Sequence, residues 1–253
     1  MHVKADLHIH SCLSPCGSLE MSPSAIVSEA KSKGLNAVAL TDHNCARNAP
    51  VFARLCERNG LRWLVGMEIT SLEEAHVLAL FDSCDDCMIL DQIIYEHLPD
   101  VKNKPEKWGD QVVVNEWDEI EQEVEKYLGT ATDLPVDELI SIIHHYNGLA
   151  IPSHIDKPVF SIVSQLGFLP PQFYDAIEIS AHDSWRQLQK RFGSFPYITA
   201  SDSHYLDTIG QVYTSLDIYE EKFTCDTVRA CLRENRFRRV RFEDKAAKNG
   251  EPC

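Results

Sequence analysis

Apolar and polar positions along the chain follow two periods, as they do in proteins that alternate strands with helices. Short apolar or period-two stretches predict strands at 3–10, 35–40, 62–70, 76–81, 149–153, 174–180, 196–201, 212–218 and 237–242. Helical spacing predicts helices at 22–33, 46–59, 86–97, 117–127, 136–147, 158–166, 183–192 and 225–235. Repeated strand–helix units predict an α/β fold with a parallel sheet, most simply an incomplete or distorted barrel.

The regular alternation breaks between residues 84 and 132, which are rich in acidic and other polar residues. Because two of the predicted helices fall in this stretch, we interpret 84–132 as a mainly helical insertion or lid. Residues 1–83 and 133–253 would then form one barrel, and a length of 253 residues suits one large domain.

The first predicted strand carries Asp6, His8 and His10 at every second position. Side chains alternate between the two faces of a strand, so these three are expected on one face, with Leu7 and Ile9 on the other. Histidine is an unusual choice for a face that only meets water. The pattern therefore indicates a two-histidine metal site in which Asp6 supports the imidazole ligands.

Other residues that can bind metals follow the predicted strands, at the ends where α/β proteins place their chemistry. They are Asp42, His43, Glu68, His154, Asp202 and His204, whereas His76 starts its strand instead of ending it. Neutral imidazoles and carboxylates suit zinc, manganese and iron. One ion cannot use so many ligands, so we expect two or three divalent ions, which lower the pKa of a water and neutralise phosphoryl oxygens.

Four ordered motifs resemble those of the PHP (polymerase and histidinol phosphatase) family. They are Asp6-Leu7-His8-Ile9-His10-Ser11, Thr41-Asp42-His43-Asn44, Gly66-Met67-Glu68-Ile69 and Ser201-Asp202-Ser203-His204. The resemblance covers about residues 4–210 and implies a distorted (β/α)7 barrel with a trinuclear metal centre that hydrolyses phosphoesters. The chain looks like a stand-alone member that acts on a small phosphorylated substrate, such as a nucleotide or sugar phosphate.

The resemblance also implies roles for individual residues. It assigns the first ion to His8, His10, Glu68 and Asp202, the second to His43 and His204, and the third to Glu68, His76 and His154. Glu68 would bridge ions, and Glu68 and Asp202 are the expected catalytic carboxylates. Asp6 and Asp42 would hydrogen-bond imidazoles and fix their tautomers. The sequence does not identify the general acid.

The chain departs from the family pattern just after the first motif. Many members have H-x-H-S-x-x-S-D-G, with the aspartate on the second ion, whereas this chain has Ser14-Pro15-Cys16-Gly17 without the acid. Three replacements are open: a thiolate ligand from Cys16, a carboxylate from Glu20 that reaches in, or a water molecule.

The formal net charge of −15 argues against a broad nucleic-acid surface, which would normally be basic. It leaves room for a small phosphate-bearing substrate or a short oligonucleotide, because bound divalent cations reverse the sign locally. Lys157 and Arg186 closely follow strand ends and are candidates for contacting the substrate phosphate.

No apolar run approaches the ~20 residues of a membrane span. The first residues also lack the basic-then-apolar layout of a signal peptide, so we expect a cytoplasmic protein with no membrane partner. Nine cysteines, an odd number without an export signal, indicate free thiols, and Cys84-Asp85-Asp86-Cys87 is a lone C-x-x-C.

Two other functions fit parts of the pattern. A metal-dependent amidohydrolase of non-phosphate substrates would also use an H-x-H strand. Such enzymes usually add a metal-bridging lysine, for which the sequence has no clear counterpart. A catalytically silent, metal-binding regulatory protein would explain the missing aspartate.

Overall fold

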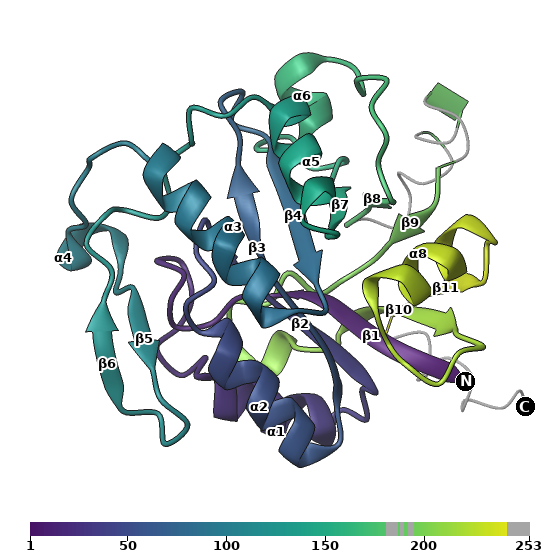
Figure 1. The fold of residues 1–253 in the computed structure, drawn as a ribbon, viewed down its shortest axis with the longest axis horizontal. Helices are drawn as coiled ribbons and strands as arrows, with labels where there is room; N and C mark the ends of the chain where they lie inside the picture. The colour runs from purple at the N-terminus through teal and green to yellow at the C-terminus, as the bar shows by residue number, and fades with distance from the viewer. Residues whose placement is uncertain (181–186, 188–189, 192–194, 242–253) are drawn as a thin grey trace, which may run out of the picture.

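A curled sheet of seven strands forms the centre of the computed structural model (Figure 1), which describes residues 1–180, 187, 190–191 and 195–241. The strand order is β11-β10-β1-β2-β3-β4-β7, and β8 and β9 form a separate pair. The bounds are β1 His2–Ile9, β2 Ala37–His43, β3 Arg62–Thr70, β4 His76–Phe81, β7 Leu149–Pro152, β8 Ile177–Glu178, β9 Tyr197–Ile198, β10 Val212–Asp217 and β11 Phe237–Arg241. The predicted bounds of β3 and β4 are confirmed.

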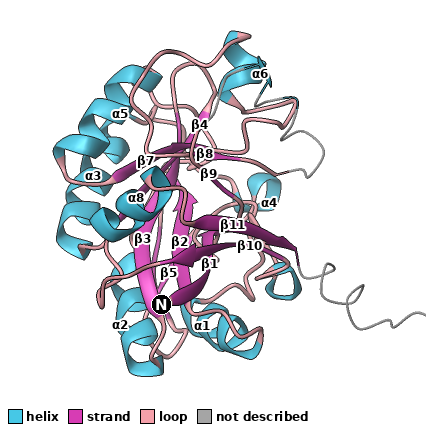
Figure 2. Cartoon of the chain, turned by 90° about the vertical axis from the view of Figure 1, so that its right-hand side faces the viewer, coloured by secondary structure: helices cyan, strands magenta, loops and turns pink. Residues whose placement is uncertain are grey.

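The pair β8 and β9 continues the curl beyond β7 (Figure 2). The amide of Asp175, just before β8, donates to the carbonyl oxygen of Ala150 in β7 at 3.1 Å. The amide of His10 donates to the carbonyl oxygen of Ser203 at 2.9 Å, so the chain after β9 returns to the end of β1. The sheet therefore curls in the manner of a TIM-like barrel and brings the ends of distant strands together.

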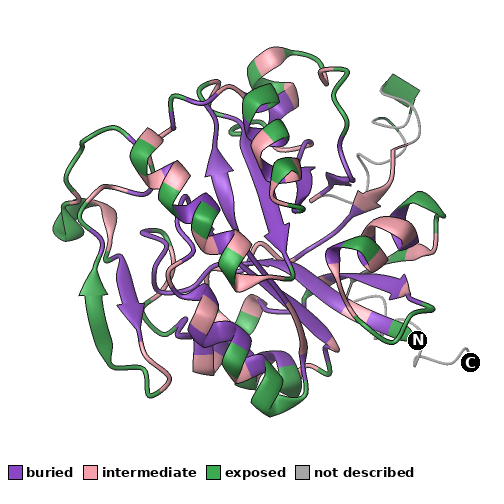
Figure 3. Cartoon of the chain, viewed as in Figure 1, coloured by how far each residue is buried: buried purple, intermediate pink, exposed green. Residues whose placement is uncertain are grey.

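The described helices lie on this sheet or in the connections between its strands. They are α1 Pro23–Ser32, α2 Ala49–Asn59, α3 Cys84–His97, α4 Pro105–Trp108, α5 Val136–His145, α6 Ile162–Leu166 and α8 Cys225–Arg233, with a short 3-10 helix at Leu206–Thr208. α2 packs on β3, α3 on β3 and β4, α5 on β7, and α8 on β10. Figure 3 shows the result, with buried strands and helices whose outward sides are exposed.

β4 runs antiparallel to both of its neighbours, so the prediction of a parallel sheet is wrong at this position. The connection from Thr70 to His76 is too short for the crossover that parallel neighbours require. Thr70 pairs directly with His76. The start of β4 therefore lies at the same edge as the ends of β2 and β3, and His76 is no exception to the pattern of strand-end ligands.

β1 does not keep strict alternation. Its register with β2 shifts between Asp6 and Ile9, and Leu7 and Ile9 pack in different core clusters. The prediction that Leu7 and Ile9 share one face is therefore wrong, because a bulge of this kind re-aims the side chains that follow it. The Nε2 atoms of His8 and His10 lie only 3.1 Å apart as a result.

Residues 84–132 contain α3, α4 and a hairpin of β5 Val112–Val114 and β6 Ile120–Glu123. The helix predicted at 117–127 is wrong. The side-chain oxygen of Asn115 accepts hydrogen bonds from the amides of Trp117 and Glu119, both at 3.0 Å, and fixes a turn there. A mainly helical insertion is thus not confirmed, and the division of the chain at 84 and 132 stays a prediction.

Two further helix predictions need comment. α6 is shorter than the helix predicted at 158–166, and the helix predicted at 183–192 lies mostly outside the described residues. Among the helices that the structure describes, none combines the length and the apolar character needed to cross a membrane.

Candidate metal centre

Polar side chains gather at the edge of the sheet where β1, β2 and β3 end and β4 begins. The loops after β7 and β9 add further polar groups at the same place. All of the predicted metal ligands lie here: His8, His10, His43, Glu68, His76, His154, Asp202 and His204. The structure therefore brings together residues from six separate segments of the chain.

Glu68, at the end of β3, is the centre of the cluster. Its Oε1 lies 3.0 Å from Nδ1 of His76 and 3.1 Å from Nε2 of His154. Its Oε2 lies 3.3 Å from Nδ1 of His43 and 3.5 Å from Nε2 of both His8 and His10. One buried carboxylate thus faces five imidazoles.

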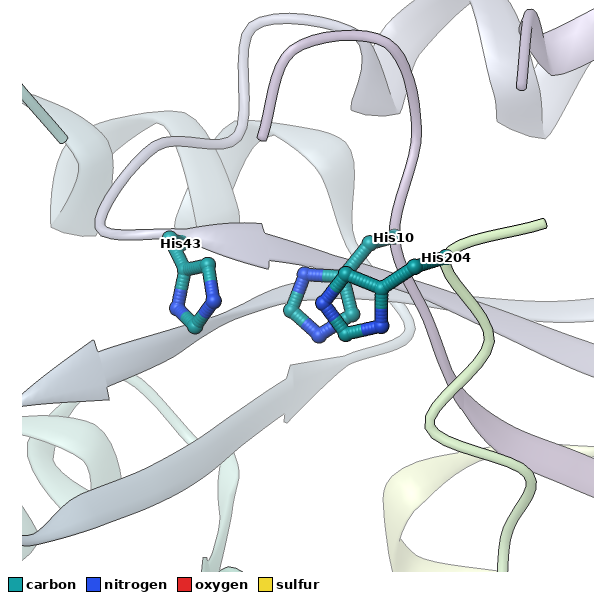
Figure 4. A group of neighbouring side chains, drawn as sticks. All are labelled: His10, His43 and His204. Atoms are coloured by element: carbon teal, nitrogen blue, oxygen red, sulfur yellow. The ribbon is translucent and has the colours of Figure 1, made fainter. Parts of the chain in front are cut away.

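Potential ligand atoms form three groups in which all atoms lie within 4.8 Å of one another. The four-residue group is His8, His10, Glu68 and Asp202, which is the set predicted for the first ion. The imidazole group, shown in Figure 4, is His10, His43 and His204. The His76 group is His43, Glu68 and His76.

The last two groups differ in detail from the predicted sets. His43 and His204 are together as expected, but His10 is also within reach of them. His76 groups with His43, whereas His154 approaches the centre only through Glu68. The division of ligands among separate ions therefore stays a prediction.

Several buried ring nitrogens in the cluster form no hydrogen bond within the described part of the chain. The Nδ1 atoms of His43 and His76 lie 3.3 and 3.0 Å from Glu68 oxygens but outside hydrogen-bond geometry, and Nδ1 of His154 has no partner there. A buried polar atom without a hydrogen bond costs about 1–3 kcal/mol, so such atoms call for an explanation. Imidazole nitrogens that converge on a carboxylate are the donor set of a divalent ion, and the residues fit zinc, manganese or iron.

The protonation states of His10, His43 and Glu68 suit a metal ion, whereas for His8 burial is outweighed by the Glu178 and Glu68 carboxylates, which raise the pKa well above its ordinary value. Burial lowers the pKa of His10 to about 4 and holds the pKa of His43 well below its ordinary value. Burial alone would raise the pKa of Glu68, but the nearby His76 and His8 outweigh it and hold that pKa well below its usual range. Neutral imidazoles and an ionised carboxylate are the forms that bind metals.

Three residues of the cluster and its loops have a strained backbone. His154 has φ of 29°, Asp202 of 51° and Asn44 of 49°, in the left-handed region that non-glycine residues seldom adopt. Each such residue raises the free energy of the folded chain by on the order of 1–3 kcal/mol. It keeps this conformation only where neighbouring contacts fix it. Asn44 shows how, since its side-chain oxygen accepts the Thr70 amide at 2.9 Å.

Glu178, at the end of β8, supports two of the imidazole residues. Its carboxylate oxygens lie 3.0 and 3.1 Å from Nδ1 of His8, and it accepts the backbone amide of His154 at 2.9 Å. Sequence reasoning placed Glu178 on a strand but gave it no role in the site. Its position at a strand end, like that of Glu68, was the signal that could have found it.

We expect Glu178→Gln to weaken metal binding about 10- to 100-fold, which is the usual effect of removing a group that hydrogen-bonds and orients a metal ligand. Glutamine keeps the size of the side chain but removes the negative charge beside His8 and replaces one acceptor oxygen with an amide donor. Competition with a chromophoric chelator measures the affinity, and Glu138→Gln on exposed α5 is the matched control. Equal affinities for the two variants would show that Glu178 does not position His8.

Asp6 and Asp42 do not hydrogen-bond imidazoles directly, so this prediction is wrong. Asp42 accepts from the Ser14 hydroxyl at 2.7 Å, and Ser14 Oγ lies 3.0 Å from Nδ1 of His10. Asp6 accepts from the Ser201 hydroxyl at 2.6 Å. Burial raises the pKa of each carboxyl group to about 6. The two acids thus fix the loops that carry the ligands, and Asp42 acts on His10 through Ser14.

Lys157 lies at the rim of the cluster, in the loop after β7. Its ammonium group donates to Oδ2 of Asp202 at 2.5 Å, and its side chain is 35% exposed. Burial lowers the pKa of Lys157, but the Asp202 carboxylate outweighs it and the pKa is raised. Lys157 is therefore a partly exposed cation beside a candidate ligand. Arg186, the other predicted phosphate contact, lies outside the described residues.

The position of the missing aspartate is not filled by a neighbouring acid or thiol. Cys16 is exposed and belongs to none of the three groups, and the same holds for Glu20. Partial burial and then the Glu68 carboxylate raise the pKa of the Cys16 thiol to about 12, which disfavours a thiolate. The imidazole group therefore contains no carboxylate in this arrangement.

The residues between α3 and α5, which include the β5–β6 hairpin, pack beside the cluster of candidate metal ligands. Asn48 donates to Ser11 Oγ at 3.0 Å and to the Val112 carbonyl oxygen at 3.2 Å, and accepts the Val114 amide at 3.0 Å. A separate, apolar group of buried residues packs the β5–β6 hairpin against the loops after β1 and β2. Its members are Leu13, Cys45, Leu98, Val113, Val124 and Leu128. The hairpin thus covers the loops that carry His10 and His43.

Comparison with known proteins gives a family match and several similar structures. The PHP domain family matches residues 6–216. The uncharacterized protein MJ1587 of Methanocaldococcus jannaschii is 36% identical over 88 residues, covering 31% of this chain and 50% of that protein. The match to the family spans most of the chain and all of the candidate ligands.

Two solved structures have a similar fold. The lesion-specific endonuclease PfuEndoQ from Pyrococcus furiosus has a TM-score of 0.69 at 20% identity, covering 92% of this chain and 56% of that one. A protein from Bifidobacterium adolescentis assigned as a metal-dependent phosphoesterase has a TM-score of 0.58 at 19% identity, covering 90% and 95%. The chain spans about half the length of MJ1587 and of the endonuclease.

Proposed function

This chain belongs to the PHP domain family, and from that premise we propose a phosphoesterase that depends on two or three divalent metal ions. The substrate would be small and phosphorylated, such as a nucleotide or sugar phosphate, and the frame a distorted (β/α)7 barrel. The observation that carries the proposal is the convergence of imidazoles on Glu68, with two of them 3.0 and 3.1 Å from one oxygen.

The candidate ligands would divide among the ions by motif. One ion would be held by His8, His10, Glu68 and Asp202, another by His43 and His204, and a third by Glu68, His76 and His154. Bound there, zinc, manganese or iron would supply a water of lowered pKa and positive charge opposite the phosphoryl oxygens. Glu68 is the ligand that the ions would share.

The chain's own residues prepare this chemistry in two ways. Burial of the cluster excludes bulk water, which strengthens every charge interaction inside it. Glu178 and the Asp42–Ser14 pair hold His8 and His10 in fixed orientations, so little reorganisation is needed when the phosphoester binds. Lys157 can turn from Asp202 to a phosphate oxygen, because its side chain is partly exposed.

The two alternatives have weaker support. An amidohydrolase would need a lysine that bridges ions, whereas Lys157 pairs with the Asp202 carboxylate. A silent metal-binding protein would need no cation at the rim of the cluster. The convergence of imidazoles on Glu68, with Glu178 and the Asp42–Ser14 pair behind them, favours the phosphoesterase.

Hydrolysis of p-nitrophenyl phosphate tests the proposal. Protein stripped with a chelator and reloaded with manganese, zinc or iron should turn over the ester, and the stripped protein should not. A screen of phosphorylated metabolites would then define the substrate. Full metal loading without turnover of any phosphoester would support the silent protein instead.

Lys157→Met is expected to lower kcat/KM for this ester about 10- to 150-fold, the cost of one hydrogen bond between charged groups. Lys31→Met, on exposed α1, is the matched control and should leave the rate unchanged. If the Lys157→Met protein had the same kcat/KM as the control, Lys157 would not contact the substrate phosphate.

A further inference from the structure

The segment around α4 lies directly beside the loop that follows β1 (Figure 1). Gly109 has φ of +99°, and a Cβ there would lie 2.0 Å from the carbonyl oxygen of Pro15, so the close approach requires glycine. The same loop reaches the metal centre, because Ser14 Oγ lies 3.0 Å from Nδ1 of His10 and the amide of Ser18 donates to the carbonyl oxygen of His204 at 3.0 Å. The α4 segment therefore borders the mouth of the metal centre.

An aromatic pair stands at this border. The rings of Trp108, the last residue of α4, and Tyr127 are stacked with centroids 4.3 Å apart and planes at 17°. Both residues are partly exposed, and neither belongs to a buried core cluster of the described chain. Gly129 lies against the Tyr127 ring, since a Cβ there would be 2.5 Å from its hydroxyl oxygen. The pair therefore forms a flat aromatic surface that Gly129 backs and that is not part of a buried core cluster.

Two lysines sit over the same ring. Nζ of Lys107 lies 4.9 Å, and Nζ of Lys104 6.0 Å, from the centroid of Trp108. Both are exposed, and in the part of the chain that the structure describes neither forms a salt bridge. Lys126, by contrast, stabilises the fold, because its ammonium group donates hydrogen bonds to the carbonyl oxygens of Tyr95 and Leu98. On a chain with a net charge of −15, unpaired lysines beside an aromatic pair suit an anionic ligand.

We propose that Trp108, Lys104 and Lys107 form a nucleotide subsite beside the metal centre. The lysines turn from the Trp108 ring to the phosphates of a short single strand, and the ring face that they leave stacks a base. The inference rests on the proposed phosphoesterase function and narrows its substrate to a nucleotide-bearing ester. A sugar phosphate without a base has no aromatic ring for this kind of stacking. Stacking and phosphate contact tolerate any base, so the subsite binds without sequence preference.

Fluorescence anisotropy of a labelled thymidine tetranucleotide with phosphorothioate links tests the subsite on the manganese-loaded protein. Because these links resist hydrolysis, the result does not depend on whether the protein turns over phosphoesters. Trp108→Ala is expected to weaken binding about 5- to 150-fold, and Trp108→Phe to retain most of the affinity. The Trp108→Ala protein should bind manganese as the wild type does, since Trp108 is not a candidate metal ligand.

Trp117→Ala is the matched control, because Trp117 is 71% exposed on the hairpin turn and is not stacked on another ring. It should bind the tetranucleotide as the wild type does. Equal affinity in the Trp108→Ala and wild-type proteins would overturn the subsite. So would an equal loss in Trp108→Ala and Trp108→Phe, or a parallel loss of manganese binding, because each would indicate a structural role.

The lysines have a separate signature in the salt dependence of binding. Each phosphate contact on a single strand contributes about 0.7 to the slope of log affinity against log salt. Lys107→Gln should therefore reduce the slope by about 0.7 and leave the Trp108 effect intact. An unchanged slope in both Lys104→Gln and Lys107→Gln would exclude the phosphate contacts.

Discussion

Replacing Glu68 with glutamine is expected to lower kcat/KM for p-nitrophenyl phosphate by about 1000-fold or more. Glutamine has the same size but only one carbonyl oxygen, so it cannot present an oxygen to the imidazoles on both sides. The loss of several kcal/mol of charge stabilisation in the transition state corresponds to this factor, since about 1.4 kcal/mol is tenfold. Steady-state kinetics on the manganese-loaded variant measures it.

The control for this variant is Glu57→Gln, an exposed glutamate on α2. It should keep wild-type kinetics and wild-type metal content. A Glu68→Gln protein that retains more than about a tenth of the activity would mean that Glu68 is not shared by the catalytic ions.

Saturating divalent metal is expected to raise the melting temperature of the stripped protein by about 5–10 °C. The ions bind the folded cluster and not the unfolded chain, which at a hundredfold excess over Kd stabilises by about 2.7 kcal/mol. For a chain of 253 residues, each kcal/mol corresponds to about 2–4 °C. Differential scanning calorimetry with manganese, zinc and iron measures the shift, and a chelator should reverse it.

The same titration on Glu68→Gln provides the internal control. Its melting temperature should respond to metal much less than that of the wild type. If no ion raised the melting temperature of the wild type, the buried Nδ1 atoms of His43, His76 and His154, which form no hydrogen bond in the described chain, would need another explanation.

The candidate ligands could be predicted from the sequence because they depend on local signals. His8 and His10 lie in one motif, and Asp202 and His204 lie in another, so residue order alone placed them. Alternation of apolar and polar positions located the strands, and the bounds of β3 and β4 were predicted correctly. The common edge then followed from the rule that α/β proteins place chemistry at strand ends.

Features that depend on pairing between segments were not predictable in the same way. The direction of β4 is set by a short connection, and only the antiparallel pairing of Thr70 with His76 explains why a strand-start histidine joins the site. The bulge in β1 depends on its register with β2. Glu178 acquires its role only when β8 lies beside β7 and places the carboxylate against His8.

The hairpin at β5 and β6 shows a different limit. Residues 117–127 have a helix-like pattern, but the Asn115 side chain binds the amides of Trp117 and Glu119 and fixes a turn before a helix can start. Local side-chain hydrogen bonds of this kind compete with helix formation. The hairpin's cover over the β1 and β2 loops is a tertiary contact, which no periodicity reveals.

In the proposed metal centre, several divalent ions share Glu68 and the surrounding imidazoles. The number and positions of these ions can be measured by anomalous scattering from crystals grown with manganese, iron or zinc, recorded at each absorption edge. Two or three peaks per chain are expected within a few Å of one another, all within bonding distance of the cluster and at least one of them on Glu68. A single peak, or none at saturating concentrations of all three metals, would contradict this shared centre.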